Sequence, residues 1–430
     1  MNSATLRLVL LVSCAHALVH VYELSLPSLE LLIGAEYAPD VDPADVARVS
    51  KQRMGLLANT WRLPFGFGAL LAGWLVARFG ARPMLILYLA GCSAMCLAAG
   101  LRVSFATLFG VMFLMGAFAS IYHPAGLTLI SCETPAASRA RALGLHGIFG
   151  SAGIAAAPFL VGLLRWFGAD WRTCYWWLAL PSAALAMTLF RHWGRAKAPL
   201  SPAIPATSPA PASAKAENKG AAPPKPIALD PDRAEWRSFS VLMVVTVLQG
   251  LVYTGVLCFL TRYLSSSPLV SQLVSADGGS SEHVATANMI SAFVLAMGCL
   301  GQYSAGRFAR LERLERQLLQ VTAANVPLLL WMSLATGNQR VWAAATFSTV
   351  HFMHQPLYNS LIALYTPVRL RSSCYGFSFA MSFGLGSFGA ALVGYSANDQ
   401  QAYQWLASLA AVSTLVAVLL WRVAPSRAAV

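Results

Sequence analysis

The chain contains GLHGIFGSAGIAAAPFLVG at residues 144–162 and GFSFAMSFGLGSFGAALVG at residues 376–394, and the two stretches resemble each other. Both are too apolar for a surface that faces water. At the same offset His123-Pro124 corresponds to Gln355-Pro356. A unit of about six hydrophobic helices that occurs twice in one chain is typical of secondary transporters, whose binding site lies between the halves.

The composition is that of a membrane protein. Of 430 residues 57% are hydrophobic and 11% are charged, and the mean hydropathy is +0.59. A water-soluble domain of this length needs far more charge on its surface. With about 20 residues for each spanning helix, the chain has room for about twelve spans and their loops. We therefore predict an all-α membrane protein with twelve transmembrane helices in two pseudo-symmetric six-helix bundles.

Apolar runs bounded by charges, Pro and Gly predict where these helices begin and end. The expected spans are residues 5–33, 52–77, 84–100, 104–130, 138–166, 172–193, 238–264, 283–306, 317–336, 340–366, 371–397 and 400–422. Residues 194–237 are rich in Pro, Ala and Lys and cannot bury a core, so we expect a disordered cytoplasmic linker there. The expected domains are an amino-terminal bundle, 1–193, and a carboxy-terminal bundle, 238–430.

The net charge is +13, and the charged residues are distributed as expected for a membrane protein. The basic residues concentrate in alternate short loops, which indicates orientation rather than a face that binds nucleic acid. If the termini lie inside, most lysines and arginines fall in inner segments, and acids such as Glu36, Asp42 and Asp277 fall in outer ones. We predict a monomer in the cell inner (plasma) membrane with both termini in the cytoplasm. The expected partners are the lipid bilayer, a small-molecule substrate and protons, with no nucleic acid.

No motif indicates catalysis or a bound cofactor. The eight cysteines show no CxxC or Cys/His finger spacing, so neither a disulfide framework nor a structural zinc site is expected. No GxxxxGK[ST] sequence is present to cradle the phosphates of ATP. The histidines and a carboxylate could perform acid–base chemistry, but no spacing of nucleophile, base and orienting group stands out. We expect a protein that is not an enzyme and has no cofactor.

Glu23 is the carboxylate expected nearest the middle of a span. His16, His20 and Glu23 follow one another at i, i+4 and i+7, and Pro27 continues the same helix face. A carboxylate in lipid costs at least about 2.5–3.5 kcal/mol, so it must face a cavity or a partner. We favour proton coupling by Glu23, tuned by His20 and His123. A structural pair with Arg62 and direct contact with substrate are the alternatives.

Arg62 lies in the second predicted helix and cannot be neutralised, so it needs an anion. Glu23 is one source of that charge, and a phosphate, phosphonate or carboxylate of the substrate is another. The alternative is an arginine that reaches the outer interface.

Six histidines are expected at membrane depth, and we favour a polar cavity lining for the helices that carry them. A path for divalent metal ions or metal chelates is the alternative, although such a path normally needs more carboxylates or thiolates. The prolines after His123 and Gln355 predict a helix break at equivalent depth in each half. The candidate substrate-binding residues are His16, Tyr22, Arg62, Tyr122, His146, His351, His354, Gln355, Tyr358 and Asn359.

The sequence GWLVARFGARP, after the second predicted helix, resembles the loop motif of the major facilitator superfamily. Gly73, Arg78, Gly80 and Arg82 are in register with that motif. The resemblance extends over essentially the whole chain and implies the major facilitator fold and alternating access. It also implies gating by these residues, because such arginines pair with acids or carbonyls when the inner gate shuts. Ala77 stands where an aspartate is usual, which puts the usual salt bridge of this gate in doubt.

The fifth predicted helix resembles the antiporter signature of superfamily exporters. Gly144, Gly153, Pro158 and Gly162 follow its spacing, which implies a gating role. Small residues at this period let helices approach closely, and the proline permits bending. The segment FLMGAFASIYHPAGLTLIS, together with the first-helix histidines, is similar to fosmidomycin-resistance-type exporters in the amino-terminal half.

These features predict a secondary active transporter that couples efflux of a small, anionic compound or drug to protons. Transport of a divalent metal ion is one alternative, and uptake by proton symport uses the same architecture. A transport-dead membrane sensor or assembly protein is an alternative of another class, and the lost aspartate at Ala77 is its best support.

Overall fold

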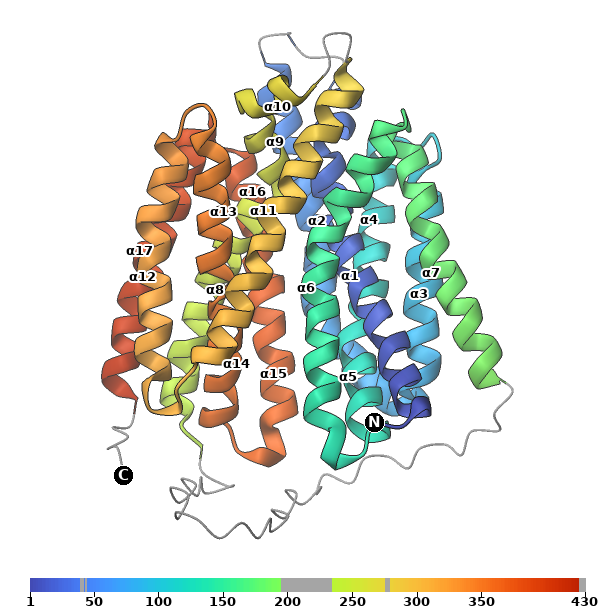
Figure 1. Ribbon diagram of the computed structural model, residues 1–430, viewed down its shortest axis with the longest axis vertical. Helices are drawn as coiled ribbons and strands as arrows, with labels where there is room; N and C mark the ends of the chain where they lie inside the picture. The colour runs from blue at the N-terminus through green and yellow to red at the C-terminus, as the bar shows by residue number, and fades with distance from the viewer. Residues whose placement is uncertain (39–41, 43–44, 195–233, 275–278, 425–430) are drawn as a thin grey trace.

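The computed structural model describes residues 1–38, 42, 45–194, 234–274 and 279–424. Every regular element within these residues is a helix (Figure 1). The expected all-helical fold is confirmed. The elements of the amino-terminal half are α1 (Ser3–Glu36), α2 (Val46–Phe79), α3 (Ala81–Ala99), α4 (Phe105–Ala119), α5 (Tyr122–Glu133), α6 (Ala136–Trp166) and α7 (Trp171–Gly194).

The carboxy-terminal half repeats this pattern with more interruptions. Its helices are α8 (Trp236–Cys258), α9 (Leu260–Ser265), α10 (Pro268–Leu273), α11 (Ser280–Phe308), η1 (Leu311–Arg313), α12 (Leu314–Leu334), α13 (Gln339–Phe352), α14 (His354–Tyr365), η2 (Val368–Leu370), α15 (Arg371–Phe379), η3 (Ala380–Gly384), η4 (Leu385–Ser387), α16 (Phe388–Gly394) and α17 (Asp399–Val423). The short α10 lies inside the segment 264–283 that the sequence predicted as a loop.

Two of the predicted spans are each broken at a proline. The predicted span 104–130 is divided into α4 and α5 four residues before Pro124, and 340–366 is divided into α13 and α14 just before Pro356. A proline has no N–H for the carbonyl four residues earlier and its ring crowds that carbonyl, which favours a break one turn upstream. The predicted helix break in each half is confirmed, and its equivalent depth in the membrane stays a prediction.

Ten of the twelve predicted segments are long and apolar enough to cross a membrane, judged on the described residues. The other two are α2, whose first turns carry Arg48, Lys51 and Arg53, and the broken pair α13–α14. Both run lengthwise among the other helices (Figure 1). The predicted linker, 194–237, lies almost entirely outside the described residues, so the domain boundaries stay a prediction.

The start of α1 and the end of α17 lie at the same end of the bundle (Figure 1). We call this end the terminal face, and the end that carries α10 the distal face. The two halves meet along three seams: α6 packs on α11, α2 packs on α15, η3 and α16, and α1 packs on α8 and α9. Along the second seam the backbones touch, since a Cβ added at Gly66 would collide with Phe383 and Gly384.

The second copy of the opening repeat is not a continuous helix. Whereas α6 is unbroken through Pro158, the corresponding segment passes through a π-helical turn, η3, and a 3-10 turn, η4, before α16. The irregular turns present the Gly386 carbonyl to α8, where the Thr254 hydroxyl donates a hydrogen bond to it. A freed carbonyl at this depth needs such a partner.

We expect Gly66→Ala to lower the temperature of half-denaturation of the purified protein in detergent. The new methyl group overpacks the α2–η3 contact, at a cost of about 1–3 kcal/mol. Gly110→Ala on α4 is the control, because a Cβ there meets nothing within 4 Å. Both changes raise helix propensity equally. Equal melting of the two variants would show that this contact is not tight.

Candidate functional site

Glu23 is bound by three side chains in the middle of the bundle. Its Oε1 lies 2.7 Å from Nη1 of Arg62, and its Oε2 lies 2.7 Å from Nδ1 of His20. The hydroxyl of Tyr253 donates to Oε1 over 3.2 Å. Glu23 and Arg62 are 2% and 1% exposed. The carboxylate is therefore fully buried and joined to both halves, because Tyr253 belongs to α8.

Two helices of the amino-terminal half place the charged members of this group. His20 and Glu23 are one turn apart on α1, and Arg62 lies midway along α2. The Arg62 guanidinium also lies over the Tyr253 ring, 5.6 Å from its centroid. Its second terminal nitrogen, Nη2, is buried without a hydrogen-bond partner. Among the described residues, the arginine thus has a donor left over that faces no acceptor.

Three histidines gather beside this ion pair. The ring nitrogens of His16, His20 and His123 offer ligand atoms that all lie within 4.8 Å of one another. Nδ1 of His16 faces the carbonyl of His146 at 2.9 Å, and the rings of these two residues stack with centroids 4.1 Å apart. Nε2 of His123 is buried without a hydrogen-bond partner. The hydroxyl of Tyr122 closes the cluster, 3.3 Å from Nδ1 of His146.

The candidates on the carboxy-terminal half form a second polar group. His351 lies between Asn325, 3.2 Å from its Nδ1, and His354, whose Nδ1 faces the His351 carbonyl at 2.6 Å. The rings of His354 and Tyr358 stack. Tyr253 lies between the two groups, because its ring also stacks on that of His351, with centroids 6.2 Å apart.

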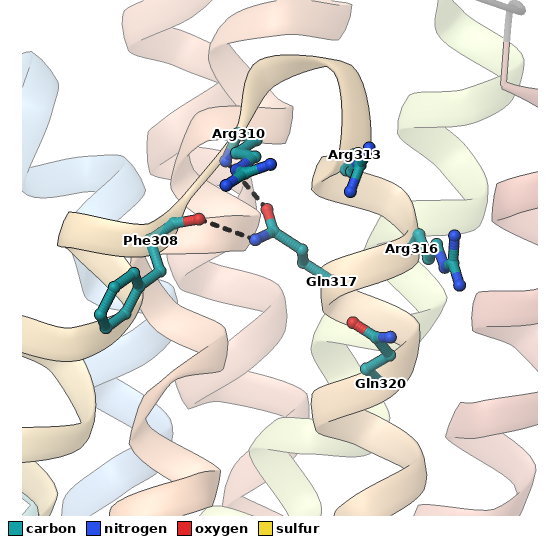
Figure 2. A pocket seen from close by; sticks show the side chains of 6 residues that line it. All are labelled: Phe308, Arg310, Arg313, Arg316, Gln317 and Gln320. Carbon is teal, nitrogen blue, oxygen red and sulfur yellow. Dashed lines mark hydrogen bonds between the residues drawn. The ribbon is translucent and has the colours of Figure 1, made fainter.

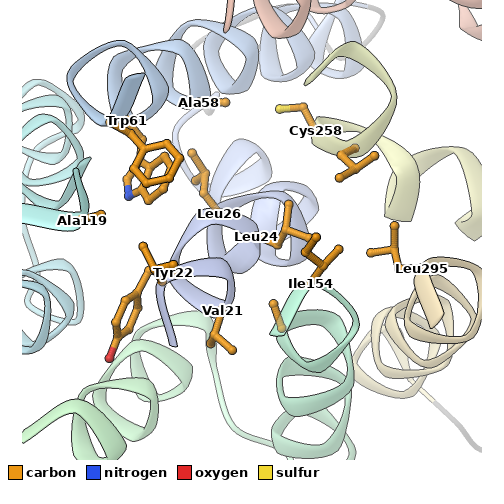
Figure 3. Packing of buried hydrophobic residues seen from close by; sticks show 14 of the residues in the cluster. Val21, Tyr22, Leu24, Leu26, Ala58, Trp61, Ala119, Ile154, Cys258 and Leu295 are labelled. Carbon is orange, nitrogen blue, oxygen red and sulfur yellow. The ribbon is translucent and has the colours of Figure 1, made fainter. Parts of the chain in front are cut away.

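The remaining candidates lie apart from these two groups. Tyr22 faces α7, where its hydroxyl donates to the Leu178 carbonyl over 3.2 Å, and Figure 3 shows its ring among buried apolar residues. Gln355 is joined to Gln302, which also accepts a hydrogen bond from Ser151 of α6. The carbonyl of Asn359 accepts a hydrogen bond from Tyr375 over 2.7 Å.

Sequence reasoning missed Glu30, which lies two turns beyond Glu23 on the same helix stripe. Glu30 is 1% exposed and forms a two-pronged ion pair with Arg262 of α9, with nitrogen–oxygen distances of 2.9 and 2.7 Å. The spacing of seven residues from Glu23 was a signal that could have found it. Nearby, Lys51 donates to Ser396 over 2.8 Å. Polar bonds therefore join the halves near the distal face.

Apolar packing fills the space between these two ion pairs. Leu24, Ala58 and Ile154 of the amino-terminal half belong to one buried cluster with Cys258 and Leu295 of the other half (Figure 3). On the other side of Glu23, Phe65 of α2 contacts the rings of Phe379 and Phe383, with centroids 5.2 and 5.5 Å apart.

The predicted gating residues fall into separate environments. Arg82 forms an ion pair with Glu133 of α5, with nitrogen–oxygen distances of 3.0 and 2.8 Å, and Arg78 lies over the ring of Phe79. Gly80 has a φ of 90°, which links α2 to α3 by a turn that favours glycine. A Cβ at Gly73 would meet nothing within 4 Å.

On α6, the predicted gating glycines differ in their surroundings. Gly153 touches the backbone of Ala17 on α1, and Gly162 lies against Ala285 of α11. A Cβ at Gly144 would meet nothing within 4 Å. Pro158 lies within the continuous α6. Two of the three glycines are therefore at helix contacts, as the spacing predicts, and their gating role stays a prediction.

The structure is similar to several solved transporters. One is a bacterial homolog of the human lysosomal transporter Spinster in an inward-facing, occupied conformation, with a TM-score of 0.68, 16% identity and 98% of each chain covered. Another is the peptide transporter POT in complex with sulfate, with a TM-score of 0.69, 10% identity and coverage of 97% of this chain and 94% of that chain. A third is a variant of the nucleoside transporter NupG, with a TM-score of 0.65, 14% identity and coverage of 98% and 100%. At these identities the likeness shows the fold alone.

The family of the chain is identified by comparing its sequence with models of known families. No curated protein matches the chain. Residues 14–391 match the Major Facilitator Superfamily. The chain therefore belongs to the Major Facilitator Superfamily, whose members are multi-pass secondary transporters and not enzymes.

Proposed function

We propose that this superfamily member exports a small anionic compound in steps coupled to protons, with the halves 1–193 and 238–430 rocking about Glu23. The observation that supports the proposal is the buried Glu23–Arg62 pair, which Tyr253 links to the second half. Arg62 is the cation at the centre, and its Nη2 has no acceptor within the part of the chain that the structure describes. An anionic substrate would supply that acceptor and compete with Glu23 for the guanidinium.

This competition makes the site sensitive to protons. When an anion takes Arg62, Glu23 loses its cation and becomes a better proton acceptor, since a buried carboxylate without a partner is costly. By this linkage alone the anion and the proton bind together, which favours movement in the same direction. The antiporter-type spacing in α6 favours exchange, and export is the direction that we propose from it. The sign of the proton signal in vesicles distinguishes exchange of the anion for protons from movement of both in the same direction.

We expect one class of anion to drive proton movement in liposomes that contain the purified protein and an internal pH-sensitive dye. Phosphonates, carboxylates and anionic drugs are the compounds to screen. Glu23→Gln should abolish the signal, because the amide cannot exchange a proton. Glu36→Gln is the matched control, since Glu36 lies near the distal face, bound to Arg172 and Trp171. Full proton movement in Glu23→Gln would refute this role.

A structural pair is the other interpretation of Glu23 and Arg62, and a double variant tests it. Either Glu23→Gln or Arg62→Gln leaves one buried charge without its partner, and we expect each to lower stability by about 3–5 kcal/mol. The double variant should recover most of this loss, measured by thermal denaturation in detergent. Arg48→Gln, which breaks the exposed pair with Asp45, should change stability by less than about 1 kcal/mol.

Transport distinguishes the two interpretations. For a coupling pair, the double variant regains stability but moves no protons with the anion. If the double variant regains both stability and proton-coupled transport, the pair is structural and the proposal fails.

A second candidate cargo is a divalent transition-metal cation, favoured by the convergence of His16, His20 and His123. Two of these imidazoles have Nδ1 against an oxygen, the Glu23 carboxylate and the His146 carbonyl, which leaves Nε2 free to bind a metal. Such outer hydrogen bonds are typical of histidines that bind metals. The group has three neutral ligands and no carboxylate of its own, so the anion remains our first choice.

If the cargo is a metal, Zn²⁺ entry into vesicles that contain a zinc-sensitive dye should disappear in His16→Ala and in His123→Ala. Neither change removes the Glu23–Arg62 pair. His192→Ala, at the exposed end of α7, should leave Zn²⁺ entry unchanged. Zn²⁺ movement that persists in both cluster variants would rule out this cargo site.

A further inference from the structure

A basic pocket lies at the terminal face, away from Glu23. It has a volume of about 370 Å³ and opens where α11 ends and α12 begins (Figure 2). Its lining residues are Phe308, Arg310, Arg313, Arg316, Gln317 and Gln320. The residues that line the pocket therefore include three arginines and one phenylalanine.

The frame of the pocket is fixed by Gln317. Its Nε2 donates to the Phe308 carbonyl over 2.8 Å, and its Oε1 accepts from the backbone N–H of Arg310 over 3.0 Å. Figure 2 shows both bonds between the first turn of α12 and the end of α11. The amide group thus holds the loop in place, and the arginines project from a fixed backbone.

The three arginines have no anionic partner in the part of the chain that the structure describes. Neither an ion pair nor a side-chain hydrogen bond is formed by Arg310, Arg313 or Arg316. Two carboxylates are close in sequence: Glu312 is exposed, and Glu315 is buried and accepts a hydrogen bond from Tyr365 over 2.7 Å. Like charges gathered on one short segment repel one another, so a bound anion would stabilise this arrangement.

The apolar surroundings indicate what kind of anion binds. Phe308 is 68% exposed and Leu311 is 57% exposed. Both lie at the ends of the candidate spans Ser280–Phe308 and Leu311–Leu334. This is the depth at which headgroups meet acyl chains, and basic pockets between helices there suit anionic lipid headgroups. Orientation in the membrane explains basic residues in this loop, but it does not require them to line a pocket beside exposed apolar side chains.

We propose that this pocket binds the phosphate headgroup of an anionic phospholipid. The guanidinium groups receive the phosphate oxygens, and Gln320 offers an amide donor. Phe308 and Leu311 contact the start of the acyl chains. This lipid-binding proposal does not depend on the cargo or on proton coupling, so it and the proposed transport function can fail separately.

The test compares two variants of the full-length protein that lose the same charge from the same face. One carries Arg310→Gln, Arg313→Gln and Arg316→Gln. The matched control carries Arg7→Gln, Arg369→Gln and Arg422→Gln, which are exposed arginines elsewhere on the terminal face. Binding of phosphatidylglycerol and of phosphatidylcholine is measured by native mass spectrometry from a neutral detergent, after both variants are shown to melt as the wild type does.

We expect the pocket variant to bind phosphatidylglycerol at least about tenfold more weakly than wild type, and the control to stay within about twofold. Phe308→Ser should weaken phosphatidylglycerol binding while the arginines remain. Equal losses in the pocket variant and the control would overturn the proposal, because net charge would then explain binding. Inorganic phosphate that competes with the lipid at equal concentration would overturn the lipid source in favour of a soluble anion.

Discussion

The ion pair between Glu23 and Arg62 is the interaction on which the centre of this transporter depends. Two opposite charges buried at membrane depth stabilise each other only while they stay in contact, and removing either one leaves a buried charge that costs several kcal/mol. His20 and Tyr253 occupy the remaining sides of the carboxylate. Any conformation in which Glu23 and Arg62 separate must therefore give Arg62 another anion and give Glu23 a proton or another cation. For a cargo that binds at this pair, as we propose, that requirement limits its chemistry.

The contacts between the halves show that the structure is closed on its distal side. Glu30–Arg262 and Lys51–Ser396 join the halves near the distal face, and the apolar cluster around Leu24 fills the space between them and Glu23. The distal side is thus closed by two polar links and packed side chains. To open that side, the Glu30–Arg262 pair must separate and both groups must find water. In the alternating access that we propose, this interface would be a two-state element, in which closure is favoured by direct pairing and opening by hydration.

Much of the fold could be predicted from the sequence, because apolar runs and prolines act locally. The breaks before Pro124 and Pro356 fall where a proline removes one N–H, although α6 stays continuous through Pro158, so the missing N–H permits a break and does not alone require one. The site was less predictable. The sequence placed Glu23 near the middle of a span but left open whether Arg62 pairs with it, binds substrate or reaches the outer interface, since that depends on how α1 and α2 are rotated. Tyr253 was missed because a single tyrosine in an apolar run has no distinguishing pattern. The π turn at η3 depends on contacts with α2 and α8, which no local pattern encodes.

Charge balance distinguishes the two candidate cargoes. An anion on Arg62 with a proton on Glu23 leaves the centre neutral, because each charged group has been matched or neutralised. A divalent cation on His16, His20 and His123 adds two positive charges beside a carboxylate that Arg62 already neutralises. Burying that excess in a low-dielectric interior is costly unless an anion enters with the metal. A metal cargo would therefore have to travel with a negatively charged companion, which again brings an anion to the unpaired Nη2 of Arg62.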